Sequence, residues 1–155
     1  MVRTFSLVAM VLMFCAGALA DTDPFIGKWK LDMRRSKYPA GSCPKTMVIV
    51  MEAAEQGVWY HSDAVYNNGG EIHAQYTAGY DGKEAMVMSA RGFLLPVSLK
   101  REGPRVVVAS YSRGMQVVAI SRRVVSKDGK FMTITTTSSD ASGKKTTTVG
   151  VYVRQ

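Results

Sequence analysis

His61 and His73 are the only histidines in this chain, and both lie in stretches rich in apolar and aromatic residues. Asp63 follows His61 by two positions, a spacing that places both side chains on one face of a β-strand. An imidazole beside a carboxylate can act in acid–base chemistry or, with further ligands, hold a metal ion. The geometry of the segment that carries both histidines therefore decides which chemistry is open to the protein.

The two histidines flank residues 67–70, Asn-Asn-Gly-Gly, which predict a tight hairpin turn. If the central Asn-Gly forms a two-residue turn, His73 faces Ala64 and His61 faces Tyr76, so the imidazoles point to opposite sides of the sheet. A one-residue bulge would reverse this result. Because no cluster of Cys, Asp or Glu completes a ligand set, we predict no metal site and no cofactor.

The same register divides the hairpin into two faces. The slightly more apolar face, which we expect inside, carries Trp59, His61, Asp63 and Val65 with Ile72, Ala74, Tyr76 and Ala78. Apolar walls with a few convergent polar groups are what a ligand pocket requires, so Trp59, His61 and Tyr76 are candidate ligand-binding residues. The alternative is that His61 and Asp63 form a solvated pair on the outside.

The rest of the chain predicts a small β-structure that positions these residues. Residues 25–33 alternate between apolar and charged, which is the pattern of a half-buried strand. Residues 34–45 contain Pro and Gly and predict a loop with at most a short helical turn. From residue 46 onward, β-rich runs separated by turn signals predict about nine to ten antiparallel strands and no long helix.

The first twenty residues are typical of a secretory signal peptide. Arg3 supplies the positive start, residues 7–16 the apolar run, and Ala18-Leu19-Ala20 a small-x-small cleavage site. A membrane anchor is the alternative, but the apolar run is too short to span a bilayer. We therefore expect export to the periplasm or the medium and one domain over residues 21–155.

The predicted mature chain is basic, with nineteen Lys and Arg against twelve Asp and Glu and a net charge of +7. This charge suits a soluble surface or an anionic partner, but export argues against nucleic acid.

Cys43 is the one cysteine left after cleavage, so no internal disulfide is expected. The numerous methionines suit either a filled core or an adaptable apolar pocket. No motif of nucleophilic, phosphate-binding or dithiol chemistry is present, so an enzyme is not expected. No other run of the chain is long and apolar enough to be a membrane helix.

Three segments resemble the fatty-acid-binding proteins of the calycin group. They are the opening Phe25-Ile26-Gly27-Lys28-Trp29-Lys30-Leu31, the run 122–135, and the ending Val149-Gly150-Val151-Tyr152-Val153-Arg154. The layout is also similar to small exported bacterial calycin-like proteins of no assigned function, which share the turns Tyr80-Asp81-Gly82-Lys83 and Lys127-Asp128-Gly129-Lys130. The resemblance implies an all-β fold, a single antiparallel up-and-down β-barrel of about 8–10 strands.

The resemblance also suggests where a ligand would be held. Fatty-acid-binding proteins hold the ligand carboxylate with an Arg-x-Tyr in the last strand, where Tyr152 matches the Tyr but Gly150 stands in place of the Arg. Arg154 shares a face with Tyr152 and is the candidate replacement. In lipocalin-like barrels, however, a late Arg stacks on the tryptophan of the opening Gly-x-Trp, so Gly27, Trp29 and Arg154 are also candidates for closing one end of the barrel.

Our first hypothesis is a non-enzymatic carrier or sensor of a small apolar or anionic amphipathic ligand, bound in the lumen by Trp59, His61, Tyr76, Tyr152 and Arg154. The alternative is an exported interaction module, such as an inhibitor of an envelope hydrolase, that acts through the loops 34–44 or 67–70 on a protein partner whose identity is unknown. An enzyme that uses His61 and Asp63 is the third hypothesis.

Overall fold

The computed structural model describes residues 23–155, which form one continuous antiparallel β-sheet of twelve strands. The predicted signal peptide, residues 1–20, lies outside the described residues. The strands are β1 (Gly27–Leu31), β2 (Thr46–Ala54), β3 (Gly57–Val65), β4 (Glu71–Ala78), β5 (Asp81–Ala85), β6 (Met88–Ser89), β7 (Gly92–Phe93), β8 (Val97–Gly103), β9 (Val106–Arg113), β10 (Gln116–Val125), β11 (Phe131–Ser139) and β12 (Lys145–Arg154). Within this range there is no helix, and hence none that could cross a membrane.

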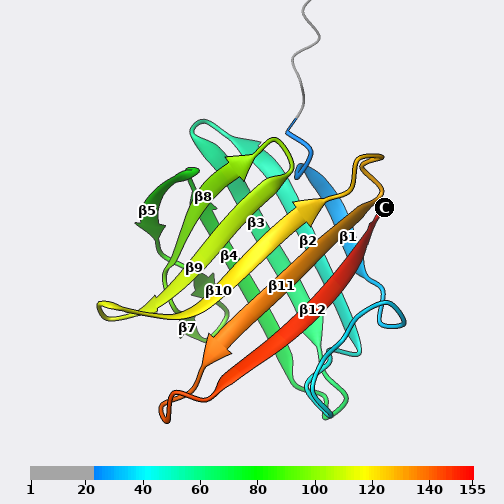
Figure 1. Cartoon of the computed structure of the whole chain (residues 1–155), viewed down its shortest axis with the longest axis vertical. Helices are drawn as coiled ribbons and strands as arrows, with labels where there is room; N and C mark the ends of the chain where they lie inside the picture. Colours follow the sequence, from blue (N-terminus) through cyan, green and yellow to red (C-terminus); the bar gives the residue numbers. More distant parts are fainter. Residues whose placement is uncertain (1–22) are drawn as a thin grey trace, which may run out of the picture.

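The sheet curls into a barrel, as Figure 1 shows, with β9–β12 crossing in front of β1–β4. Its strand order is β5-β8-β9-β10-β11-β12-β1-β2-β3-β4-β6-β7, so β12 pairs with β1 and joins the two ends of the chain. The predicted antiparallel all-β barrel is confirmed. There are twelve strands instead of the expected eight to ten, because residues 81–103 divide into β5–β8, and β6 and β7 have two residues each.

The barrel is not closed by backbone pairing between β4 and β5. These strands are in contact but do not pair, and the β6–β7 hairpin joins β4 through one residue pair, Gln75 with Met88. The side chain of Val87 fills part of this opening and is buried. At the seam between β4 and β8 the strands do not pair, and the barrel is closed there by side chains.

One end of the barrel is filled by apolar side chains. Phe25 and Trp29 are at most 1% exposed and pack with buried residues of every large strand around them. The Trp29 indole N–H donates to the carbonyl of Phe25 at 2.9 Å, which satisfies its polar atom inside the core. The interior of the barrel at this end is therefore packed with apolar side chains.

The other end is covered by the loop between β1 and β2. No helix forms there, and a backbone bridge between Lys37 and Val149 ties the loop to β12, the neighbour of β1. Tyr38 follows the bridge and packs against the core. The predicted loop is thus confirmed, and it places a tyrosine over the less tightly filled half of the barrel.

Candidate functional site

The β3–β4 hairpin has a register one residue away from the predicted one. His73 pairs with Asp63, and His61 pairs with Gln75. The turn contains three residues between Tyr66 and Gly70, with the Gly70 carbonyl accepting from the Tyr66 amide at 2.9 Å. A two-residue type I′ turn would need a positive φ at both central residues, but only glycines in the described chain have one. Asn68 does not adopt a positive φ, so the turn has three residues instead of two.

This shift reverses the faces of β3. Tyr60, Ser62 and Ala64 point into the barrel and are buried, whereas Trp59 and His61 lie on the outer face. The prediction that Trp59 and His61 line the lumen is therefore wrong, because a one-residue slip exchanges the two faces of a strand. The prediction that the two histidines lie on opposite faces is wrong for the same reason.

The histidines instead meet on the outer face through Asp63. Its two carboxylate oxygens accept hydrogen bonds from His61 Nε2 at 2.7 Å and from His73 Nδ1 at 2.5 Å. Hydrogen bonding to Asp63 and Glu71 raises the pKa of His73, and the bond from His73 contributes most to lowering the pKa of Asp63. Trp59 stacks on the His61 ring with 5.8 Å between ring centroids. The result is an ordered polar cluster on a solvent-facing sheet surface.

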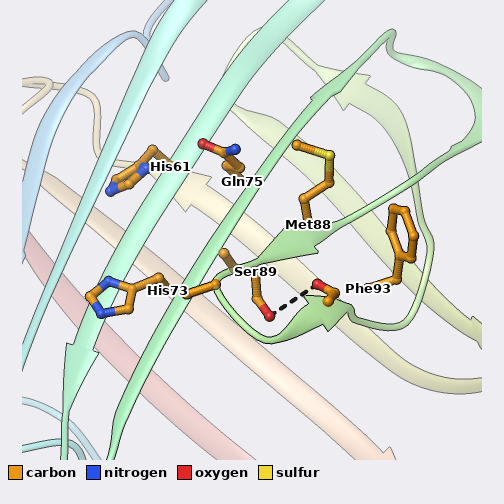
Figure 2. Close-up of a pocket in the computed structure, with 9 residues that line it drawn as sticks. His61, His73, Gln75, Met88, Ser89 and Phe93 are labelled. Atoms are coloured by element: carbon orange, nitrogen blue, oxygen red, sulfur yellow. Dashed lines mark hydrogen bonds between the residues drawn. The ribbon is translucent and has the colours of Figure 1, made fainter.

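A groove of about 320 Å³ begins beside this cluster. Figure 2 shows His61 and His73 on one side of it, Gln75 next to them, and Met88 and Phe93 on the β6–β7 hairpin opposite. A hydrogen bond from the Ser89 hydroxyl to the Gly92 carbonyl, at 3.1 Å, holds that hairpin in shape. The groove thus combines two imidazoles with an apolar wall, outside the barrel.

Inside the barrel, the most unusual group is Arg123 on β10. Its side chain is 3% exposed, and no carboxylate among residues 23–155 lies within ion-pair distance of it. Its guanidinium donates to the Tyr111 hydroxyl at 3.1 Å and lies 5.1 Å from the centroid of the Tyr60 ring. Its Nε has no hydrogen-bond partner. Buried charges are normally paired, so this cation is incompletely satisfied within the protein.

The guanidinium nevertheless keeps its proton. Burial acts to lower the pKa of Arg123, but the tyrosines around it (Tyr76, Tyr111 and Tyr60) more than offset that effect and the pKa lies above its usual value. Arginine is in any case protonated at physiological pH. The barrel interior therefore carries a permanent positive charge.

Tyrosine hydroxyls surround this charge. Burial raises the pKa of Tyr60 to about 12 and raises the pKa values of Tyr76 and Tyr152 further. All three hydroxyls are thus protonated near neutral pH and can donate hydrogen bonds. The Tyr76 hydroxyl has no partner in the protein, while that of Tyr152 donates to the sulfur of Met47 at 3.2 Å. Tyr76 and Tyr152, two predicted site residues, are thus both inside the barrel.

Two cavities meet at this cluster. One, of about 160 Å³, is bounded by Arg123 and Tyr152 among others. The second, of about 340 Å³, lies at the seam between β4 and β8. Its lining is Tyr60, Ser62, Ala74, Tyr76, Val87, Leu94, Leu95 and Tyr111. Tyr60 and Tyr111 border both cavities, whereas Arg123 lines only the smaller one.

Gly150 of the last strand lies at the same level of the barrel as Arg123. In the sheet, Arg123 pairs with Ile134 and Ile134 with Gly150, so all three belong to one cross-strand row. A Cβ at position 150 would lie 2.8 Å from both the Tyr38 hydroxyl and the Tyr152 ring. There is no room for an arginine at position 150, and the charge at this level of the barrel comes from Arg123, two strands away on β10.

Arg154 lies at the packed end and not near Arg123. Its guanidinium is 4.1 Å from the centroid of the Trp29 ring and donates to the carbonyls of Pro24 and Ile26 at 2.6 Å and Gly129 at 2.7 Å. A Cβ on Gly27 would come within 2.6 Å of this guanidinium. Gly27, Trp29 and Arg154 therefore form the expected closing contact, and the donors of Arg154 are used within it.

The sequence reasoning missed Arg123, although a signal was present. Arg122 and Arg123 are adjacent in a strand, and adjacent side chains in a strand point to opposite faces. Since Ser121, Arg123 and Val125 share a face, and Val125 belongs to the core, one arginine of the pair had to point inward.

Comparisons with known proteins place this barrel in a class. No protein-family model matches the sequence, and no curated protein matches it. A crystal structure of zebrafish ileal bile acid-binding protein complexed with cholic acid matches over 85% of this chain and 99% of that chain, with a TM-score of 0.56 and 16% identity. The chain therefore shares the fold of that protein, an antiparallel calycin-like β-barrel.

Proposed function

We propose that this protein binds a small amphipathic molecule inside the barrel and is not an enzyme. The anionic headgroup, such as a carboxylate, lies against Arg123, and the apolar part lies in the seam cavity between β4 and β8. The single observation that carries this proposal is the buried guanidinium without an acidic partner. An anion would supply charge-assisted hydrogen bonds that the protein does not make itself.

The cavities have the composition that such a molecule requires. The seam cavity is about 340 Å³, within the lower part of the range of small-molecule sites, roughly 300–1,000 Å³. Leu94, Leu95 and Val87 form its apolar wall, and Tyr76 offers an unpaired hydroxyl near the charged end. An apolar chain along this wall with its headgroup toward Arg123 would satisfy both ends at once.

The structural similarity adds support. A barrel of the same fold, zebrafish ileal bile acid-binding protein, was crystallised with cholic acid, which is itself a carboxylic acid. The signal-peptide pattern of residues 1–20 supports a carrier that works outside the cytoplasm. We therefore place the proposed cargo among anionic amphiphiles available in the periplasm or the surrounding medium.

Native mass spectrometry of the protein, purified without detergent from its own host, tests the proposal. We expect a reproducible mass excess that disappears on organic extraction. Arg123→Met should lack the excess, whereas Arg122→Met, the adjacent arginine on the outer face, should keep it. The same excess at the same occupancy in Arg123→Met would contradict a site at Arg123. Circular dichroism of each variant verifies that it is folded.

A further inference from the structure

Residues 86–96 form a flap over the seam between β4 and β8. The strands that enter and leave this segment pair with each other, because Ala85 at the end of β5 pairs with Val97 at the start of β8. The middle of the flap is the β6–β7 hairpin, closed where the Leu94 amide donates to the Val87 carbonyl at 2.8 Å. A surface segment whose two ends lie together can move as one body about that stem.

The flap forms the outer wall of the cavity in which we place the apolar part of the ligand. Val87, Leu94 and Leu95 line this cavity from the flap, while Tyr76 lines it from β4 and Tyr111 from β9. Movement of the flap away from β4 would therefore open the cavity to solvent.

Few contacts hold the flap against the barrel. It pairs with β4 only through Gln75 and Met88, and within residues 23–155 no side-chain hydrogen bond or ion pair joins it to another element. Val87 is the one buried residue of the flap, whereas Met88 and Phe93 are 45% and 71% exposed. Segments with few buried apolar contacts open locally at a smaller cost than the core.

The loop at the other end of the barrel is held more firmly. Lys37 and Val149 exchange two backbone hydrogen bonds, of 2.7 and 2.8 Å. The Ser36 hydroxyl accepts a third from the Val151 amide at 2.9 Å. Displacing this loop would break all three bonds, whereas the flap is joined to β4 by a single residue pair.

We propose that the flap opens about the Ala85–Val97 stem and is the entrance through which the ligand reaches the barrel interior. Val87 leaves its buried position in the open state, and the seam cavity is then accessible from outside. The role as an entrance rests on the proposed function, whereas the opening itself requires no ligand.

Thiol labelling tests the opening without a ligand. The protein is residues 21–155 with Cys43→Ser, so that its only thiol is the one introduced at a buried valine. Val87→Cys places the thiol in the flap, and the control Val107→Cys places it in β9, which pairs with strands on both sides. We expect Ellman's reagent to label Val87→Cys at least about tenfold faster than Val107→Cys, because local opening exposes only the first. Equal labelling rates in the two folded variants would overturn the proposal.

A disulfide between the flap and β4 tests the entrance. Gln75 and Met88 both line the outer groove in Figure 2, and the Cα atoms of such a pair are about 4.5–5.5 Å apart, a distance that a disulfide spans. Gln75→Cys with Met88→Cys, in the Cys43→Ser protein, should exchange decanoate at least about tenfold more slowly when oxidised, with the rate restored by reductant. The control, Lys37→Cys with Val149→Cys, locks the loop at the other end and should exchange decanoate equally fast in both states.

NMR exchange spectroscopy with carboxyl-labelled decanoate measures these rates. Equal rates for the oxidised and reduced flap variant would overturn the entrance, and so would slower exchange in the oxidised control alone. Absence of decanoate binding in the Cys43→Ser parent would instead contradict the proposed function, and the labelling rates would still decide whether the flap opens.

Discussion

Replacing Arg123 with Met should make the ligand-free protein more stable while it abolishes binding. The change removes one hydrogen bond, worth about 1 kcal/mol, and a cation–π contact worth about 1–2 kcal/mol. It also removes an unpaired buried Nε, which costs about 1–3 kcal/mol, and the desolvation of a charge, which costs several kcal/mol. Met fills most of the vacated volume with apolar atoms and stabilises by about 2 kcal/mol.

We therefore expect the free energy of unfolding of Arg123→Met to exceed that of the wild type by about 1–4 kcal/mol, the range found when buried ion pairs are replaced by apolar residues. For a domain of this size, each kcal/mol corresponds to about 3–5 °C in Tm. Urea unfolding of the extracted apo-protein measures the free energy of unfolding directly. The exposed Arg122→Met is the matched control, and its stability should change by less than about 0.5 kcal/mol.

Addition of ligand should make the wild type more stable than Arg123→Met. A ligand that binds only the folded wild type stabilises it by about 2.7 kcal/mol at a hundredfold excess over Kd, and leaves Arg123→Met unchanged. A folded Arg123→Met variant that is less stable than the apo wild type by more than about 1 kcal/mol would refute the reasoning. Equal stabilisation of both proteins by ligand would refute it as well.

Three further predictions concern the frame of the barrel. Gly27→Ala should destabilise by about 1–3 kcal/mol, because its φ is 135° and a Cβ would lie 2.6 Å from Arg154 Nη1. Gly103→Ala is the control and should change the urea midpoint little, because its φ is not positive and a Cβ would make only an ordinary contact, 4.0 Å from the Val106 side chain. The free energy of unfolding should fall as pH rises from about 10 to 12, because the pKa of a tyrosine is near 10 in the unfolded chain and that of Tyr60 is about 12 in the folded protein. Tyr60 alone accounts for a fall of about 3 kcal/mol. A fall of the same size in Tyr60→Phe would contradict the assignment to Tyr60. Gly150→Arg should destabilise by about 1–3 kcal/mol or more through overpacking against Tyr38 and Tyr152, and a variant with wild-type Tm would show that the space is available.

The fold was predictable because its signals are local and repeated. Turn residues between β-rich runs mark the hairpins, and the opening Gly-x-Trp marks the closed end, where Trp29 and Arg154 meet as expected. These patterns need only strand periodicity and turn chemistry, both of which are encoded within a few residues. The strands β6 and β7 were not predicted, because a strand of two residues is too short to show the alternation of apolar and polar residues.

The site was harder to predict because it depends on register. The sequence Asn68-Gly69 suits a two-residue turn, and the choice of a three-residue turn, with a positive φ of 78° at Gly69 alone, moved every β3 side chain to the other face. That one-residue difference removed His61 from the lumen and brought it to Asp63 and His73. Arg123 was missed for another reason: a charged residue is rarely buried, and only the barrel shows that this one is enclosed.

The most direct test of the central claim is a calorimetric comparison of decanoate with decanol. The two molecules share one apolar chain and differ in the anionic headgroup that Arg123 would hold. We predict that the wild type and Arg122→Met bind decanoate at least about tenfold more tightly than decanol, since a charge-assisted bond is worth about 1.5–3 kcal/mol, and that Arg123→Met loses this preference. Equal affinities in the wild type, or a carboxylate preference that persists in Arg123→Met, would contradict an anion site at Arg123.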